Sequence, residues 1–499
     1  MAHKTIDALA AEARARLDAL AGRASLSTAE RREIPVQEMP NQAPLDRIRN
    51  MSEVALGYTR EQAQLEALRC LQCKNSPCIA GCPVGVNIPG FIGAIAQGDL
   101  RRSLEVLKES NLLPAICGRV CPQEIQCQAR CVVGKMHKDP NRAVSIGRLE
   151  RFVADFGRQQ HWAAAPDIKP ATGKKVGIVG SGPASLTAAV DLRREGHAVT
   201  IFEAFHKPGG VMVYGIPEFR LPKSIVEADV EALIRIGVEI RTNFVVGRTR
   251  TMAQLLDEDG YDAIFIGTGA GLPKFMHVEG ESLVGVYSAN EYLTRVNLMR
   301  AYNAERASTP ILHPRRVAVF GGGNVAMDSA RSALRLGAEQ VHLIYRRTEA
   351  EMPARLEEIQ HAKEEGVQFH FLENAKRILG DDADRVIGVE LLRYRLGEPD
   401  PSGRASPVAI DGSEFTLDVD GVIVAIGNDS NPLLVQATPG LKADKYGRIQ
   451  VDQDLKTSLD RVYAGGDIVQ GAATVIIAMG QGRRAAQSIN ALLAGCGSL

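Results

Sequence analysis

Residues 174–204 read KKVGIVGSGPASLTAAVDLRREGHAVTIFEA. The apolar run before Gly180 predicts a buried β-strand, and the pattern after the glycine turn predicts a helix followed by a second strand. Glycines in such a turn let a pyrophosphate approach the helix N-terminus, and Glu203 ends the second strand, where an acid binds ribose hydroxyls. The stretch therefore predicts a dinucleotide-binding βαβ unit. Its candidate cofactor-binding residues in the turn are Gly180, Gly182, Pro183 and Ala184.

A second stretch of the same kind occupies residues 315–347, RRVAVFGGGNVAMDSARSALRLGAEQVHLIYRR. Its second strand ends at Arg346 and Arg347, where an NAD site would carry an acid. Guanidinium groups there match a 2′-phosphate through charge-assisted hydrogen bonds, which favours NADP(H); plain surface charge is the alternative interpretation. The candidate turn residues are Gly321, Gly323, Asn324 and Val325.

The end of the chain supplies what a flavin site needs. In residues 461–486, RVYAGGDIVQGAATVIIAMGQGRRAA, a strand leads to Asp467 and a helix begins near Ala473 and Thr474. Asp467 can bond a ribityl chain, and a helix N-terminus can stabilise negative charge on a reduced isoalloxazine. We therefore assign FAD to the first dinucleotide site; an ordinary turn at the Gly-Gly-Asp sequence is the alternative.

Eight of the nine cysteines lie within 62 residues. Residues 70–83 read CLQCKNSPCIAGCP, and residues 117–131 read CGRVCPQEIQCQARC. Short spacings let a loop place three thiolates around one cubane, and a cysteine before proline serves the other cluster in two-cluster ferredoxins. The pattern favours iron–sulfur clusters over paired zinc sites, which remain the alternative.

The composition narrows the class of protein. The chain has 499 residues, formal net charge +0 and 45% hydrophobic residues, which predicts a folded protein of about three domains. A neutral balance argues against a nucleic-acid partner, and no apolar window is long enough for a membrane span. The N-terminal residues lack the apolar core of a secretory signal, so we expect a cytoplasmic protein with reduced cysteines. The helical pattern of residues 5–22 predicts an arm that packs or contacts another subunit in an oligomer.

The chain resembles a known family. The runs CLQCKNSPCIAGCPVGVNIPGF, LPAICGRVCPQEIQCQARCVVGK and SIGRLERFVADF resemble the N-terminal domain of the glutamate synthase small (beta) subunit. The large subunit of NADH-dependent reduced ferredoxin:NADP oxidoreductase and the N-terminus of dihydropyrimidine dehydrogenase are similar. The resemblance extends from about Cys70 to Ala486, with the cysteine pattern and both nucleotide fingerprints in the family's order.

The resemblance implies the metal ligands. One [4Fe–4S] cluster would use Cys70, Cys73, Cys78 and Cys131. The other would use Cys82, Cys121, Cys127 and, as an oxygen ligand, Glu150. Cys117 matches a family cysteine that does not ligate. An exposed helical acid is the alternative interpretation of Glu150.

The resemblance also implies the architecture. Residues 207–223, KPGGVMVYGIPEFRLPK, are similar to the family's flavin-binding stretch and place Gly210 in that site. We expect an α/β protein with an N-terminal helical double-cluster iron–sulfur domain and two Rossmann-like domains, the second inserted in the first. The expected boundaries are 1–165 for the iron–sulfur domain with its arm, 170–290 and 425–499 for the FAD domain, and 291–424 for the NADP(H) domain.

The function implied is an NADPH-dependent oxidoreductase subunit. Hydride would move between NADP(H) and FAD, and single electrons would pass through two [4Fe–4S] clusters to or from a partner. The partner would be a glutamate synthase large subunit or a ferredoxin-linked small subunit. No catalytic acid, base or nucleophile is required, and the chain has no room for its own amidotransferase and FMN barrel. The competing hypothesis is a zinc-stabilised dinucleotide-binding module without redox catalysis.

Overall fold

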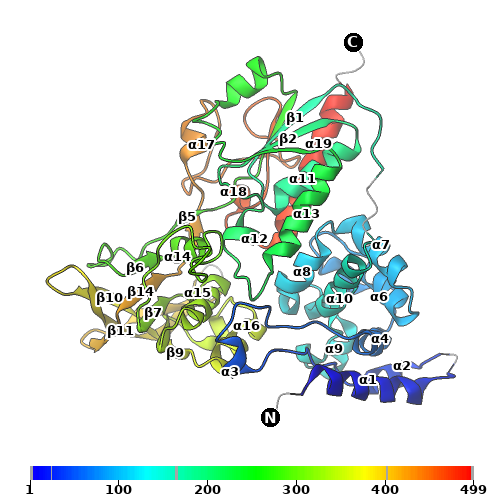
Figure 1. The fold of residues 1–499 in the computed structure, drawn as a ribbon, viewed down its shortest axis with the longest axis horizontal. Coiled ribbons are helices and arrows are strands. Elements are labelled where there is room, and N and C mark those ends of the chain that lie inside the picture. Colours follow the sequence, from blue (N-terminus) through cyan, green and yellow to red (C-terminus); the bar gives the residue numbers. More distant parts are fainter. Residues whose placement is uncertain (1–3, 24, 163–166, 401–402, 496–499) are drawn as a thin grey trace.

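A computed structural model describes residues 4–23, 25–162, 167–400 and 403–495, so Cys496 and the predicted domain ends at 1, 165 and 499 lie outside the described residues. A helical N-terminal part lies beside two parallel sheets (Figure 1). The polypeptide leaves the first sheet after β4, builds the second sheet, and returns to the first with β16. The second dinucleotide-binding fold is therefore inserted in the first, as the sequence predicted.

The helical part is built around the cysteines. Thr59 and Gln62 form a capping box that starts α4, and α10 packs against α8. Apolar residues of α6, α7 and α10 form one core with Cys127 and Cys131. The helices are α1 (Ile6–Leu20), α2 (Thr28–Glu33), α3 (Pro44–Arg47), α4 (Arg60–Leu68), α5 (Pro77–Ala80), α6 (Ile88–Ala96), α7 (Leu100–Ser110), α8 (Pro114–Val120), η1 (Gln123–Ile125), η2 (Gln128–Arg130), α9 (Val132–His137), η3 (Pro140–Arg142) and α10 (Ile146–Gln159).

The first sheet is parallel throughout, in the order β16-β4-β1-β2-β3. Its central strands are buried on both faces, which explains why they read as unbroken apolar runs. The strands are β1 (Lys175–Val179), β2 (Ala198–Phe202), β3 (Glu239–Arg241), β4 (Ala263–Ile266) and β16 (Val462–Ala464). Around it lie α11 (Pro183–Arg194), α12 (Val211–Tyr214), α13 (Lys223–Arg235), the π-helix η4 (Gln254–Glu258), α17 (Leu433–Gln436), α18 (Asp467–Gln470) and α19 (Val475–Gly495).

The second sheet repeats this plan in the order β6-β14-β7-β8-β9, again all parallel. Its strands are β6 (Val286–Ser288), β7 (Arg316–Phe320), β8 (Gln340–Tyr345), β9 (Gln368–Phe371) and β14 (Gly421–Val424). Its helices are α14 (Ala289–Val296), α15 (Asn324–Arg335), η5 (Glu349–Glu351) and α16 (Leu356–Glu364). Short strands β5 (Leu272–Pro273) and β15 (Asn428–Asp429) pair where the chain crosses between the two folds.

An antiparallel sheet with no clear periodic signal in the sequence extends the second fold. It contains β10 (Glu373–Gly380), β11 (Val386–Pro399), β12 (Ala405–Ala409) and β13 (Phe415–Leu417). Buried and exposed residues alternate only in part of β11, so the two-residue period is weak in the sequence. In the described residues, no helix is both long and apolar enough to cross a membrane.

Candidate functional site

The first predicted turn joins β1 to α11. Gly180 has φ +92, and a Cβ there would lie 2.7 Å from the carbonyl oxygen of Gly267, so only glycine fits. Gly182 is the N-cap of α11 and Pro183 is its first residue, where a missing N–H has no cost. The turn thus leaves the N-terminus of a 12-residue helix facing outward from the strand end.

Glu203 and Gly210 lie against this turn. Glu203 directly follows β2, is buried, and accepts hydrogen bonds from the backbone N–H of Ser181 (3.0 Å) and Phe205 (2.8 Å). Gly210 has φ +57, and a Cβ there would lie 2.9 Å from the Cα of Gly182. The structure therefore brings both predicted residues to the glycine turn.

The C-terminal residues approach the same place. Gly466 has φ +83, and a Cβ there would lie 3.3 Å from the Cβ of Ala184 in α11. Asp467 follows as the first residue of α18, and its Oδ1 accepts a hydrogen bond from the Ala473 N–H at 3.2 Å. Burial raises the pKa of Asp467 to about 6. Thr474 immediately precedes α19, so the N-termini of two long helices flank the turn.

These residues fit a flavin dinucleotide. Glycines line a cradle that a Cβ would fill, helix N–H groups are available for phosphate, and the partly buried carboxylate of Asp467 stands near the start of α19. When bound, the flavin would supply the exchange between two-electron and one-electron chemistry.

The second predicted turn joins β7 to α15. Gly321 has φ +145, and a Cβ there would lie 2.3 Å from the carbonyl oxygen of Ala425. The Asn324 side-chain oxygen accepts a hydrogen bond from the Arg355 N–H at 3.0 Å. The turn's other predicted residues open the helix as its N-cap and second residue: Gly323 and Val325.

The two arginines that follow β8 differ in their surroundings. Arg346 is exposed. Arg347 is buried; its Nη2 lies 2.8 Å from Asp400 Oδ2, and its Nε donates to the Ala405 carbonyl at 2.7 Å. Arg347 thus attaches the ends of β11 and β12 to β8, while Arg346 is left at the surface of the nucleotide turn.

Four of the predicted cluster ligands line one cavity of about 360 Å³. These are Cys70, Cys73, Cys78 and Cys131. The cavity walls are otherwise apolar, with Ile88, Ile92 and Ile146 among them. Burial, reinforced by neighbouring thiols, raises the pKa of Cys70 to about 11 and the pKa of Cys78 to about 12. A bound cationic cluster would reverse this preference for the thiol form.

The other predicted ligands form a second group around Glu150. Cys82, Cys121 and Cys127 all have Glu150 as an electrostatic neighbour, and burial raises the pKa of Cys127 well above its usual range. Glu150 itself accepts a hydrogen bond from Asn111 Nδ2 at 2.6 Å. Burial raises the pKa of Glu150 to about 8. The residue is not an exposed helical acid.

Cys117 lies between this group and the flavin-binding fold. It is buried, hydrogen-bonded to Cys121, and its Sγ lies 3.6 Å from the Sδ of Met479 in α19. Gly480 of the same helix approaches Val84, two residues after Cys82: a Cβ on Gly480 would lie 3.1 Å from Val84 Cγ1. Helix α19 therefore connects the predicted flavin site with the second cysteine group.

The four thiols of the first group line one cavity and do not converge on a point. In the part of the chain that the structure describes, no three His, Cys, Asp or Glu side chains are placed to hold one metal ion, and the eight described cysteines form no disulfide. A zinc ion requires four ligands within about 2.3 Å of one centre, whereas a cubane spreads its four thiolates over its corners. The arrangement fits the cubane better than zinc.

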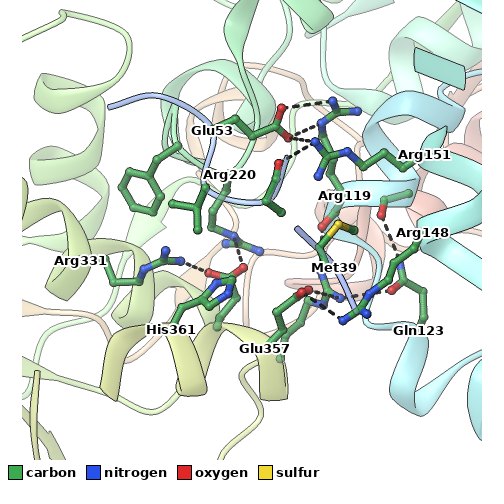
Figure 2. A pocket seen from close by; sticks show the side chains of 16 residues that line it. Met39, Glu53, Arg119, Gln123, Arg148, Arg151, Arg220, Arg331, Glu357 and His361 are labelled. Atoms are coloured by element: carbon green, nitrogen blue, oxygen red, sulfur yellow. Dashed lines mark hydrogen bonds and ion pairs between the residues drawn. The ribbon is translucent and has the colours of Figure 1, made fainter. Parts of the chain in front are cut away.

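A buried charged junction, which motif analysis could not find, joins the three folded parts (Figure 2). Arg220, between the two dinucleotide folds, pairs with Asp328 at 2.7 Å and with Glu358 at 3.2 Å. Arg355 donates to the Arg119 carbonyl at 2.7 Å. The side chains surround a cavity of about 470 Å³. Because arginines and carboxylates from distant segments alternate here, the junction fixes how the parts are docked.

Two further contacts extend the junction. Arg148 of α10 pairs with Glu357 of α16 at 3.4 Å, and Arg47 of α3, fully buried, pairs with Glu365 at 2.7 Å. The extended stretch that contains α3 thereby attaches to the second dinucleotide fold.

This fold and these turns define a two-dinucleotide oxidoreductase that carries a cysteine-rich helical domain. Residues 47–162 match the family model "dihydropyrimidine dehydrogenase domain II, 4Fe-4S cluster", and residues 174–482 match that of pyridine nucleotide-disulphide oxidoreductases. The chain is 37% identical over 461 residues to the glutamate synthase [NADPH] small chain of Azospirillum brasilense, covering 91% of this chain and 94% of that protein. The chain belongs to the glutamate synthase small chain family.

Two further proteins are similar to this chain, one in sequence and one in fold. The beta subunit of an NADP(+)-dependent formate dehydrogenase from Moorella thermoacetica is 40% identical over 440 residues, which are 84% of this chain and 60% of that protein. FprA from Mycobacterium tuberculosis (His57Gln mutant) aligns with a TM-score of 0.54 at 22% identity, covering 66% of this chain and 85% of that one, which bears on the fold alone.

The matches confirm the predicted family, fold class and oxidoreductase activity. They also confirm the cofactor set of FAD, NADP(H) and [4Fe–4S] at the level of the family. The number of clusters, the individual site residues and the domain boundaries stay predictions.

Proposed function

We propose that this chain is the NADPH-linked electron-transfer subunit of a larger oxidoreductase. It moves hydride between NADP(H) and FAD, and passes single electrons through two [4Fe–4S] clusters to or from a partner protein. The observation that carries the proposal is the position of α19. Its N-terminus flanks the predicted flavin turn, and its Met479 touches Cys117 beside the second cysteine group.

The clusters follow from the two cysteine groups. The first cluster is held by Cys70, Cys73, Cys78 and Cys131, which share one cavity. The second is held by Cys82, Cys121, Cys127 and Glu150, which are electrostatic neighbours. A carboxylate ligand makes the second cluster more negative than a neutral ligand in the same position would. The added negative charge favours the oxidised state of the cluster.

The contacts also order the cofactors. The second group lies next to α19, whereas Val132 and Val133 of α9 line the cavity of the first group, and α9 lies in the part of the helical domain away from β1 (Figure 1). Electrons therefore pass from NADP(H) to FAD, then to the second cluster, and then to the first, or in reverse. We place the corresponding domains at 1–165, at 170–290 with 425–499, and at 291–424.

Protein groups position the nucleotides. Arg346 offers an exposed guanidinium for the 2′-phosphate of NADP(H), and the Arg347–Asp400 pair holds the neighbouring hairpin. Asp467 and the N-terminus of α19 would hold the flavin, and the helix dipole would stabilise negative charge on its reduced ring.

The partner accepts or supplies single electrons. Relatives named as small chains or beta subunits imply a larger protein that completes the reaction. A glutamate synthase large subunit and a ferredoxin-linked small subunit are the two candidates, and both place this chain in the cytoplasm as part of an oligomer.

Anaerobic preparation tests the proposal. We expect about eight iron and eight acid-labile sulfide atoms per chain, flavin absorption bands, and bleaching of those bands by NADPH well before NADH. Copurification then separates the two partners by size. A colourless protein that contains zinc and no sulfide would establish the competing binding module.

A further inference from the structure

Exposed cations lie close in the sequence to residues that line the first cysteine cavity. They come from the loop after Cys73, from η2, from α9 and its C-cap, and from η3, and we call them the basic collar: Lys74, Arg130, Lys135, Lys138 and Arg142. The cavity lining includes Cys73, Pro77 and Val132.

The collar is one surface because its elements pack together. Helix α9 packs against η2 and η3, and α5 packs against η2. The aliphatic part of Arg130 lies against Gly81, between the two cysteine runs. Figure 1 places α9 in the part of the helical domain away from β1. The collar thus lies beside the cysteine group whose cavity α9 helps to line.

The collar carries uncompensated charge. Among the described residues, none of its five side chains has an ion-pair partner. The neighbouring acid, Asp139, accepts a hydrogen bond from the Asn141 N–H at 2.9 Å. Many other surface cations are paired, as in Lys363 with Glu349 at 2.6 Å. In a chain of zero net charge, this concentration of one sign generates a local positive potential that steers anionic partners.

We propose that the basic collar is the docking surface for an acidic electron-transfer protein, one that surrounds its own redox centre with carboxylates. This rests on the proposed function, since it takes the first cluster as the terminal one. Opposite charges would bring the two centres together and orient them, and the weakly screened potential would set the association rate. The apolar rim at Pro77 and Val132 would then exclude water between the cofactors.

Charge reversal tests the collar on the holoenzyme. The probe is a bacterial [4Fe–4S] ferredoxin of strongly negative net charge, and the first readout is its binding by calorimetry, which needs no turnover. In Lys74→Glu/Lys135→Glu/Lys138→Glu we expect the Kd to rise about tenfold or more at low salt. The triple Lys→Gln variant, which adds no repulsion, should show a smaller rise. Iron content and melting temperature show whether either variant is folded and loaded.

The matched control reverses three exposed, unpaired cations of the FAD fold: Arg248→Glu/Lys442→Glu/Lys445→Glu. We expect wild-type binding from this control. Wild-type Kd should also rise steeply with salt, and the salt dependence should flatten in the collar variants. Wild-type Kd and salt dependence in a loaded collar variant, or an equal loss in the control, would overturn the proposal.

Turnover assays distinguish a failure of the collar proposal from a failure of the proposed function on which it rests. NADPH oxidation with menadione, a neutral acceptor, should be unchanged in the collar variants, whereas ferredoxin reduction should fall about tenfold. Absence of menadione reduction by the wild type would reject the proposed function, and the calorimetric result would still decide the collar.

Discussion

Glu150 is a partly buried carboxylate whose neighbours are thiols and an amide. If it ligates the second cluster, Glu150→Ala should lower the iron content from about eight to about four atoms per chain, because the other cluster keeps its four cysteines. Glu150→Gln should retain iron but raise the reduction potential of one cluster, because a neutral ligand stabilises the oxidised state less than a carboxylate does. Iron analysis and an EPR-monitored redox titration measure both.

The control for this prediction is Cys117→Ser. The serine keeps the volume of a residue that hydrogen-bonds Cys121 without being assigned as a ligand. We expect full iron content from Cys117→Ser. Loss of four iron atoms from Cys117→Ser, together with full iron content in Glu150→Ala, would show that Cys117 is the ligand and Glu150 is not.

We predict different effects for substitutions of the adjacent residues Arg346 and Arg347. Arg346→Ala should raise the KM for NADPH about tenfold or more and leave the KM for NADH nearly unchanged, since a charge-assisted phosphate contact is lost. Arg347→Ala should lower the melting temperature, because it leaves Asp400 without this buried partner. Steady-state kinetics with both nucleotides measures the split, and equal effects of Arg346→Ala on both would contradict the assignment.

The sequence could identify the candidate residues but not their competing contacts. Cys70, Asp467 and Gly321 stand in motifs whose spacing is local, so they could be found without a fold. The pairing of Arg347 with Asp400 joins segments 53 residues apart through a sheet that has no motif. Such a contact depends on tertiary packing, which local patterns do not encode.

At the scale of elements, the contact between α11 and α19 shapes the predicted flavin site. A Cβ on Gly482 would lie 2.0 Å from the Ala184 carbonyl oxygen. Gly482→Ala should therefore push α19 off the glycine turn, destabilise the fold by about 1–3 kcal/mol or more, and lower the flavin content. Flavin release and thermal melting measure this. Gly495→Ala, at a position with no neighbour within 4 Å, should leave both as in the wild type.

Helices and strands could be predicted from the sequence where the pattern of apolar residues was strong. The two βαβ units appear as parallel sheets because their strands are unbroken apolar runs with glycine at the end. The β10–β13 sheet was missed because β11 alternates only in part, and α3 was missed because four residues provide too little periodicity. Short or half-exposed elements take their conformation from packing, as Arg47 of α3 does against Glu365.

At the scale of the molecule, the charged junction predicts a pH-dependent stability. Burial and Arg331 lower the pKa of His361 to about 4, and Glu358, Glu357 and Arg47 also face this ring. The unfolded chain, where histidine has a pKa near 6.5, therefore binds more protons between pH 4 and 6.5. Stability should be full above about pH 6.5 and fall as the pH decreases through this window.

Thermal melts between pH 5 and 7.5 measure the effect. His361→Gln should flatten the pH dependence between pH 5 and 6.5, while His206→Gln, at an exposed position, should retain it. The carboxylates act in the same direction at lower pH, because their arginine partners lower the pKa of Glu358 to about 2. A wild-type melting temperature that is flat from pH 5 to 7.5 would contradict the role of His361.

The proposed order of the cofactors (flavin, second cluster, first cluster) leads to a prediction that must be tested on the whole chain. If the second cluster lies between the flavin and the first cluster, a Glu150→Ala enzyme that has lost it should still have its flavin bleached by NADPH at the wild-type rate. Its first cluster should stay oxidised on the timescale of turnover, because electron transfer from the flavin to the first cluster is slow when the second cluster no longer lies between them. Dithionite, which reaches the surface directly, should still reduce that cluster through the open cavity lined by Cys73. Stopped-flow spectra with NADPH and EPR of samples frozen after each reductant distinguish the steps. Rapid reduction of the first cluster by NADPH in this variant would place that cluster next to the flavin and reverse the proposed order.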